Sequence, residues 1–327
     1  MDHTEGLVSL ESIRDAAERL AGVARRTPLL PVEEGPGGYA GAIRLKCESL
    51  QRGGSFKLRG AYNFISRLPD ARRSRGVVTY SSGNHGRAVA LAARILALPA
   101  VVVVPVDAPR VKVEGIRRLG AEVVAEGTTS VQRQRRALAI AEARGLEVVP
   151  PFDDPRIIAG QGTVGLEIAE DWPDVERVVV PIGGGGLISG VAAALTALRP
   201  SVRVYGVQAE GAASMRKSLD AGRPVELESV DTIADGLKPV RPGDLTFQHV
   251  RSLVVDVVTV SDAAIVESML WCAYECKLLV EPSGAAALAA LSHPAIAGTR
   301  EGTAVVLSGG NLDPAVLADG AGPGATT

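Results

Sequence analysis

The stretch Val178–Ile182 (VVVPI) leads directly into Gly183–Gly190 (GGGGLISG), and this junction decides the fold. The apolar, β-branched run predicts a buried parallel strand. The glycines leave no side chain to hold the backbone away from a ligand, and the alanine-rich segment 191–198 predicts the helix that follows. Because the free N–H groups and the dipole of a helix N-terminus attract anions, the junction indicates a phosphate-binding site.

The glycine run fits neither common nucleotide-binding pattern. A P-loop ends in Lys-Ser or Lys-Thr, whereas Leu187 and Ile188 follow the last glycine here. The dinucleotide fingerprint has spaced glycines in the first βαβ unit, and this run begins past the middle of the chain. A glycine-rich turn that packs a strand closely against a helix is the alternative interpretation.

The composition is typical of an alanine- and valine-rich α/β enzyme, with 46% hydrophobic and 3% aromatic residues in a chain of 327. A formal net charge of −2 offers no basic excess, which argues against a nucleic-acid partner. Without a signal-peptide pattern or a membrane-spanning apolar run, we expect a cytoplasmic protein that binds no membrane. Cys47, Cys272 and Cys276 lack zinc-like spacing, so we expect no metal site.

Apolar runs and helical patterns alternate between residues 76 and 152 and predict a compact βαβ lobe. Its expected strands are 77–80, 100–104, 122–125 and 146–149, and its expected helices are 87–97, 109–119 and 131–143. Further strands are expected at 178–182, 202–207 and 303–307, and an N-terminal helix is indicated by Ile13, Ala17 and Leu20. We therefore predict an α/β fold of two doubly wound open-sheet lobes, in which the smaller lobe, 76–152, is inserted into a larger lobe formed by 1–75 and 153–327.

Two more segments carry chemistry. Ser55–Gly60 (SFKLRG) places Lys57 behind an aromatic residue, and an apolar setting makes a lysine amine more available as a nucleophile. Ser81–Gly86 (SSGNHG) directly follows a predicted strand, at the edge where parallel sheets bind ligands. Its hydroxyls, amide and helix N-terminal N–H groups suit a carboxylate, although a helix-capping turn is the simpler interpretation.

A nucleophilic lysine, a phosphate cradle and a carboxylate cradle point to a phosphorylated aldehyde that reacts with an amino acid. The chain resembles the β-family, or fold type II, of pyridoxal-phosphate enzymes, within it the serine/threonine dehydratase and serine racemase group. The resembling motifs occur in the family's order and span nearly the whole chain: Ser55–Gly60, Ser81–Gly86, Ala159–Thr163, Gly183–Leu187, Thr232–Gly236 and Ser308–Asn311. The resemblance implies the tryptophan synthase β-like fold and pyridoxal 5'-phosphate as the cofactor.

The resemblance also implies roles for individual residues. Lys57 would hold the cofactor as a Schiff base and act in catalysis, with Phe56 beside the ring and Asn84 bonded to its phenolic oxygen. The phosphate would be bound by the amides of Gly183, Gly184, Gly185, Gly186 and Leu187, and the pyridine nitrogen would face Ser308. The substrate carboxylate would be held by Ser81, Ser82, Asn84 and His85. For Asp235, the residue itself leaves two interpretations open: it positions the departing hydroxyl, or it lies in a helix cap or turn.

Ser308 decides the expected reaction. A carboxylate at this place would keep the pyridine nitrogen protonated and make the ring a strong electron sink, whereas a neutral hydroxyl does not. Loss of the β-hydroxyl as the proton leaves Cα avoids storing that charge. We therefore expect β-elimination of a β-hydroxy amino acid, with L-threonine or L-serine as substrate, to give a 2-keto acid and ammonia.

Three alternatives stay open. A serine racemase would use Ser82 as the acid on the opposite face of the cofactor, but dehydratases of this group share that serine. Racemases of the group also resemble one another in an acidic cation site, where this chain has Gln208 and Ser214. A hydroxyaspartate dehydratase or racemase would present the same reacting groups, and a catalytically silent binding protein is the non-enzyme alternative. The resemblance implies a homodimer or homotetramer.

Overall fold

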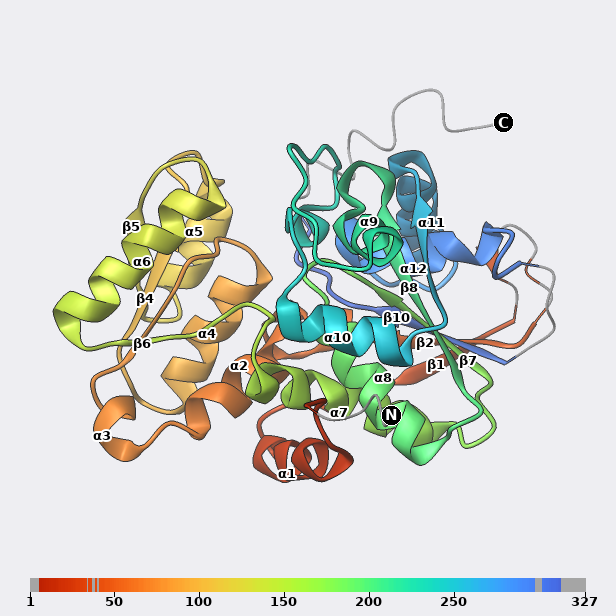
Figure 1. Cartoon of the computed structure of the whole chain (residues 1–327), viewed down its shortest axis with the longest axis horizontal. Coiled ribbons are helices and arrows are strands. Elements are labelled where there is room, and N and C mark those ends of the chain that lie inside the picture. The colour runs from red at the N-terminus through yellow and green to blue at the C-terminus, as the bar shows by residue number, and fades with distance from the viewer. Residues whose placement is uncertain (1–5, 34, 37–38, 40, 298–301, 313–327) are drawn as a thin grey trace.

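The computed structural model describes residues 6–33, 35–36, 39, 41–297 and 302–312. Two β-sheets lie side by side, each with helices on both faces (Figure 1). One sheet takes its strands from residues 29–47 and 177–307, and the other takes its strands from residues 77–148. This arrangement is the predicted α/β fold with two open sheets.

The larger sheet has six strands in the order β1-β2-β10-β7-β8-β9. All neighbours are parallel except β1 and β2, which are antiparallel. The strands are β1 (Leu29–Val32), β2 (Ile43–Cys47), β7 (Arg177–Pro181), β8 (Arg203–Ala209), β9 (Asp256–Val260) and β10 (Thr303–Leu307). The sequence predicts β7, β8 and β10 to within about two residues at each end and does not predict β9.

The smaller sheet has four parallel strands in the order β5-β4-β3-β6. Its strands are β3 (Val77–Thr79), β4 (Ala100–Val104), β5 (Glu122–Ala125) and β6 (Glu147–Val148). The helices beside it are α4 (Asn84–Ile95), α5 (Arg110–Arg117) and α6 (Ser130–Arg144), with the short α3 (Asp70–Arg73) before β3. All four strands predicted for this segment are present.

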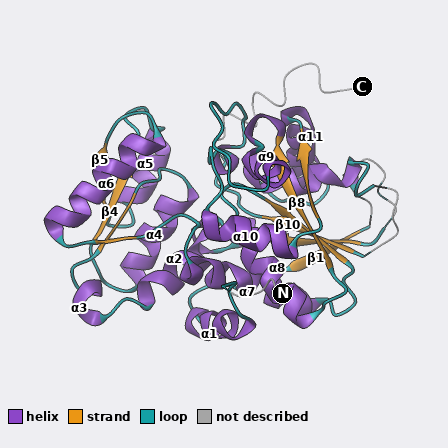
Figure 2. Cartoon of the chain, in the orientation of Figure 1, coloured by secondary structure: helices purple, strands orange, loops and turns teal. Residues whose placement is uncertain are grey.

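Helices cover both faces of the larger sheet (Figure 2). They are α1 (Leu10–Leu20), α2 (Lys57–Ser66), α7 (Pro155–Asp171), α8 (Gly186–Leu198), α9 (Ser214–Ala221), α10 (Asp244–Leu253), α11 (Asp262–Tyr274) and α12 (Pro282–Ala289). One face packs on α7, α8 and α10, and the other packs on α11 and α12. None of the helices in the described part of the chain is long and apolar enough to cross a membrane.

Helix α8 begins at Gly186, five residues before the start expected from the alanine pattern. Gly185, at φ 100°, turns the chain from the strand into the helix. Gly190, inside the helix, faces the backbone of α7, where a Cβ atom would lie 2.4 Å from the nitrogen of Gly162. The predicted helix start was therefore wrong. The helix also includes glycines before the alanine-rich segment, and these glycines allow α8 to pack closely on α7.

Helix α2 joins the two sheets. Leu58, Phe64 and Ile65 lie in one apolar core with Val77 and Val102 of the smaller sheet. The same helix also packs along α7, which covers the larger sheet. We call the larger sheet with its helices the larger body, and the smaller sheet with its helices the smaller body. The division of the chain into 1–75 with 153–327 and 76–152 stays a prediction. The shared core shows that α2 packs in the smaller body as well as in the larger one.

Candidate active site

Lys57 lies where the two bodies meet, as the first residue of α2. The chain before it is fixed to the end of β10, because Ser55 pairs with Gly309 and the Phe56 N–H donates to the Ser308 carbonyl oxygen at 3.2 Å. The Lys57 amine donates to the carbonyl oxygen of Pro151 at 2.7 Å. Burial lowers the pKa of Lys57 to about 8, so much of its amine is neutral near that pH.

Residues Gly183–Leu187, here called the glycine loop, follow β7 and open α8. Within the described chain, no hydrogen bond takes the N–H groups of Gly183, Gly184 or Gly185. The first N–H groups of α8 also lack partners inside the helix. Buried backbone donors are almost always paired, so this run of free donors at a positive helix end indicates an anion site.

The protein packs tightly behind the glycine loop. A Cβ atom at Gly184 would lie 2.3 Å from the Phe152 ring, and one at Gly183 would lie 2.6 Å from the carbonyl oxygen of Gly236. The Thr246 hydroxyl donates to the Gly184 carbonyl oxygen at 2.6 Å. The sequence offers no sign of Phe152 or Thr246, because neither lies in a glycine-rich or catalytic motif.

Residues Ser81–Gly86, here called the serine loop, follow β3, and α4 begins at Asn84. The Ser81 and Ser82 hydroxyls are half-buried and have no hydrogen-bond partner among the described residues. His85 differs from the expected arrangement, because its imidazole is buried and Nε2 lies 3.1 Å from the Val149 carbonyl oxygen. Burial, with the Lys57 charge, lowers the pKa of His85 to about 3, so the ring is neutral and is engaged away from the serine loop.

Asn84 is held by two side chains of the larger body. Its Nδ2 donates to Oε1 of Glu281 at 2.5 Å, and its Oδ1 accepts from Nδ2 of Asn311 at 2.7 Å. Burial raises the pKa of Glu281 to about 7. Glu281 lies outside every motif singled out in the sequence, and Asn311 ends one of them without an assigned role. The two contacts fix the direction of the Asn84 amide.

Ser308 follows β10 and is buried. Its hydroxyl donates to the Ser283 carbonyl oxygen at 3.3 Å, while its own carbonyl oxygen accepts from Phe56. The strand end therefore brings a neutral hydroxyl next to the segment that carries Lys57. The structure thus places Lys57, Phe56 and Ser308 together.

Asp235 lies in a short 3-10 helix, Asp235–Leu237, and its side chain is 63% exposed. Its carboxylate pairs with Lys112 of α5 at 2.9 Å and with Lys238 at 2.8 Å. Because Lys112 belongs to the smaller body, the first ion pair links the two bodies. Among the described residues, these two lysines are the hydrogen-bond and ion-pair partners of the Asp235 carboxylate.

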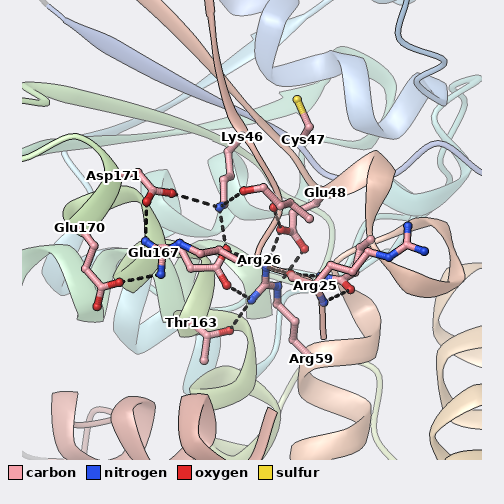
Figure 3. A network of polar contacts seen from close by, with 12 residues as sticks. Arg25, Arg26, Lys46, Cys47, Glu48, Arg59, Thr163, Glu167, Glu170 and Asp171 are labelled. Carbon is pink, nitrogen blue, oxygen red and sulfur yellow. Dashed lines mark hydrogen bonds and ion pairs between the residues drawn. The ribbon is translucent and has the colours of Figure 1, made fainter. Parts of the chain in front are cut away.

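The side chain of Arg59, two residues after Lys57, lies in a buried cluster of charges (Figure 3). It contacts Glu48 at 2.8 Å and Glu167 at 2.6 Å, and Lys46 also pairs with Glu167 at 2.6 Å. Burial opposes both charges of the Arg59–Glu48 pair, but their attraction outweighs it: the pKa of Glu48 is lowered and that of Arg59 is raised. This cluster, named the Arg59 cluster, ties α2 to β2 and α7.

The fold and site define a class. The family model described as pyridoxal-phosphate-dependent enzyme matches residues 20–309, and the chain belongs to that family. The cofactor is pyridoxal 5'-phosphate, and the unpartnered glycine-loop amides and the buried Lys57 amine fit its phosphate and its aldehyde. The match between these protein groups and the cofactor's phosphate and aldehyde is a property of the site, separate from the likeness in overall fold.

Particular relatives narrow the class. The chain is 46% identical over 308 residues to the L-threonine ammonia-lyase of Thermotoga maritima, covering 94% of this chain and 76% of the relative. Among solved structures, maize serine racemase has a TM-score of 0.89 at 39% identity, with 95% of this chain and 96% of that chain covered. The processed form of threonine deaminase isoform 2 from Solanum lycopersicum has a TM-score of 0.89 at 37% identity, with 95% and 86% covered.

Proposed function

We propose that this enzyme is an ammonia-lyase that converts L-threonine or L-serine to a 2-keto acid and ammonia. The observation that carries the proposal is the neutral Ser308 hydroxyl beside the Lys57 segment, in a chain 46% identical to an L-threonine ammonia-lyase. When bound, pyridoxal phosphate draws electrons from Cα of an amino acid and makes its Cα proton acidic. A neutral partner for the pyridine nitrogen favours immediate loss of the β-hydroxyl over storage of that charge.

The cofactor would be held by residues from both bodies. In the proposal, Lys57 bonds to its aldehyde, Phe56 lies beside its ring, and Ser308 faces its nitrogen. Asn84 would donate to its phenolic oxygen, a role supported by the amide orientation that Glu281 and Asn311 impose. The glycine-loop amides of Gly183, Gly184, Gly185, Gly186 and Leu187 would bind its phosphate.

The substrate carboxylate would be bound by the serine loop. The free hydroxyls of Ser81 and Ser82, the backbone N–H of Asn84 and the other N–H groups at the start of α4 are its proposed ligands. His85 would contribute its backbone N–H, since its ring bonds to Val149. For Asp235, the Lys112 ion pair supports a role in holding the two bodies together beside the site.

Lys57 would also move the proton. Its Nζ, released when the substrate amine takes its place, would accept the proton from Cα, and the lowered pKa of Lys57 supports this base role. The β-hydroxyl would leave as water by taking up a proton, for which the ammonium formed on Lys57 is a donor, and addition of water to the resulting imine would release ammonia and the keto acid. Exclusion of water by the paired bodies would protect the reacting centre until that step.

Serine racemisation is the second candidate, because a serine racemase is among the similar structures and the Ser82 hydroxyl is free to give a proton to Cα. Against it, the Gln208 amide is engaged by backbone groups, donating to the Ala212 carbonyl oxygen at 3.1 Å and accepting from Arg216 N–H at 3.0 Å. Gln208 therefore offers no carboxylate to a cation at this position. The relative named L-threo-3-hydroxyaspartate ammonia-lyase, 41% identical, makes hydroxyaspartate a third substrate to assay.

A substrate screen tests the proposal. The holoenzyme is incubated with L-threonine, L-serine, D-serine and L-threo-3-hydroxyaspartate, and keto acid, ammonia and D-serine are measured. We expect keto acid and ammonia in equal amounts, fastest from L-threonine or L-serine. Accumulation of D-serine faster than keto acid would replace the lyase proposal with a racemase.

We further propose that the enzyme works in the cytoplasm as a homodimer or homotetramer. Cys47 and Cys272 are buried free thiols, which suits a reducing compartment. Tyr274 and Leu279 are large apolar side chains that are 67% and 60% exposed, and such side chains are common at subunit contacts. Light scattering of the purified protein should give two or four times the mass of the chain; the mass of a single chain would contradict the assembly.

A further inference from the structure

In three consecutive residues, the segment that joins β6 to α7 contacts two parts of the proposed site and the start of α10. The carbonyl oxygen of Pro151 accepts from the Lys57 amine at 2.7 Å. The ring of Phe152 lies against Gly184 of the glycine loop. Asp153, the third residue, points to the start of α10. The hydrogen bonds between Asp153 and the start of α10 therefore also restrain Phe152, the preceding residue, which packs against the glycine loop.

Asp153 caps a helix that lies 91 residues away in the sequence. Its Oδ2 accepts from the N–H of Asp244 at 3.0 Å, and its Oδ1 accepts from Leu245 and Thr246, each at 3.1 Å. The helix's own N-cap residue is Gly243, which has no side chain to do this. A Cβ atom at Gly243 would lie 2.1 Å from Oδ1 of Asp153, so the carboxylate occupies the place of the missing cap.

The capped turn in turn touches the glycine loop. The Thr246 hydroxyl donates to the Gly184 carbonyl oxygen at 2.6 Å, and its Cβ would lie 2.8 Å from a Cβ atom at Gly185. The Ser189 hydroxyl of α8 donates to the Thr246 carbonyl oxygen at 3.4 Å. Asp153 thus holds both the Phe152 side and the Thr246 side of the loop.

We propose that Asp153 is a positioning residue for the glycine loop: it caps α10 and thereby holds Phe152 and Thr246 against the backbone that binds the cofactor phosphate. The proposal rests on the phosphate-binding role of this loop. Asp153 itself contacts no proposed cofactor ligand directly, so its effect should fall on the phosphate and leave the bond to Lys57 unchanged.

Binding of two aldehydes to the cofactor-free protein separates these effects. Pyridoxal 5'-phosphate and pyridoxal differ only in the phosphate, and both react with Lys57. For Asp153→Ala we expect the Kd of pyridoxal 5'-phosphate to rise about tenfold, a factor that corresponds to ~1.4 kcal/mol, while the Kd of pyridoxal changes less than about twofold. Asp153→Asn should recover most of the affinity, because asparagine caps helices nearly as well as aspartate.

Asp154 provides the matched control. It is the neighbouring aspartate and also caps a helix, accepting from the Arg156 N–H of α7 at 2.8 Å. The carboxylate of Asp154 is hydrogen-bonded to Arg156, whose guanidinium lies over the ring of Phe64 in α2. Asp154→Ala should therefore leave the ratio of the two dissociation constants unchanged, and a shift equal to that of Asp153→Ala would overturn the proposal.

The other outcomes are equally decisive. Tighter phosphate binding in Asp153→Ala or Asp153→Asn would mean that the carboxylate repels the phosphate, which contradicts a positioning role. If Asp153→Ala leaves the ratio of the two dissociation constants unchanged while the wild type prefers the phosphorylated aldehyde, the positioning role of Asp153 is refuted and the phosphate-binding role of the glycine loop is not. A wild type that does not prefer it would refute the phosphate-binding role of the glycine loop itself, and the Asp153 proposal with it.

Discussion

The Arg59 cluster and the glycine loop are both rich in polar groups, but these groups are paired within the protein in the cluster and unpaired in the loop. In the Arg59 cluster, Arg59 meets Glu48 and Glu167, and Lys46 completes the ion pairs. In the glycine loop, consecutive N–H donors have no partner in the described chain. Polar groups that are paired within the protein hold its shape, and polar groups left without partners are where a ligand completes the structure.

Lys57 stands between these two regions. Helix α2 carries it at its first residue and carries Arg59 half a turn later, so the Arg59 cluster fixes the helix from which the Lys57 amine extends. On its other side the amine meets Pro151, next to the residue that packs on the glycine loop. We therefore predict that changes on the paired side alter stability and changes on the open side alter cofactor binding.

Lys57→Ala should give the largest effect. Loss of the amine removes both the bond to the cofactor and the base, and general acid–base catalysis alone contributes about 10²–10⁴-fold in rate. We expect no measurable keto-acid formation and no visible Schiff-base absorbance. Lys217→Ala, at an exposed lysine of α9, is the control and should keep both. Turnover in Lys57→Ala would remove Lys57 from the mechanism.

Arg59→Met tests the paired side. The change leaves Glu48 buried without its cation, and breaking a buried ion pair costs about 3–5 kcal/mol of unfolding free energy. Urea unfolding of the holoenzyme measures the loss. Arg136→Met, which breaks an exposed pair with Glu126 at 3.7 Å, should cost about 0.5 kcal/mol or less. Equal losses in the two variants would show that the Arg59 cluster does not stabilise the fold.

Gly184→Ala tests the open side. The added methyl group would push against the Phe152 ring, and we expect the loop amides to shift and the Kd of pyridoxal 5'-phosphate to rise at least about tenfold. The absorbance titration of cofactor-free protein measures this. Gly115→Ala in α5, where a Cβ atom meets only the tip of Arg87 at 4.0 Å, should leave the affinity unchanged.

The pKa of Lys57 predicts a pH dependence of cofactor loading. Burial lowers this pKa to about 8, whereas an ordinary lysine titrates near 10.4. Only the neutral amine attacks an aldehyde, so the loading rate of the cofactor-free protein should rise with pH, with its midpoint near 8, and then level off. Stopped-flow absorbance across the range from weakly acidic to strongly basic pH measures the rate. A rate that still climbs steeply well above the expected midpoint would indicate a solvated lysine.

Magnesium should have the smallest effect. The Gln208 amide is engaged by Ala212 and Arg216, and the Ser214 hydroxyl donates to the Pro239 carbonyl oxygen at 3.1 Å. Neither position offers the carboxylate that a hard cation prefers, so millimolar magnesium or a chelator should change the rate less than about twofold. Strong activation by magnesium would point to a cation site elsewhere and would favour the racemase alternative.

Much of the fold could be predicted because it rests on local patterns. Buried parallel strands are continuously apolar, and this identified β4, β7 and β10 within a residue or two. Strand β9 (DVVTV) was missed, although it lies beside β8. Its short apolar run carries polar residues, which the sequence alone does not distinguish from a loop.

The site divides in the same way. Lys57, Phe56 and Ser308 were predicted together, and the structure brings their segments into contact through Ser55–Gly309 and Phe56–Ser308. Phe152, Thr246, Glu281 and Asp153 could not be predicted, because each acts through a partner far along the chain. The orientation of His85 was also beyond the sequence: the same residue could face the loop or, as found, Val149 in the core.

Reduction of the holoenzyme with borohydride, followed by peptide mass spectrometry, shows which lysine carries the cofactor. Borohydride makes the bond between cofactor aldehyde and amine permanent, so the modified lysine can be located. We predict a single pyridoxyl-phosphate adduct on the peptide that contains Lys57, and its loss in Lys57→Ala. An adduct on another lysine, or none in a protein that binds the cofactor, would contradict the assignment of Lys57 and the site built around it.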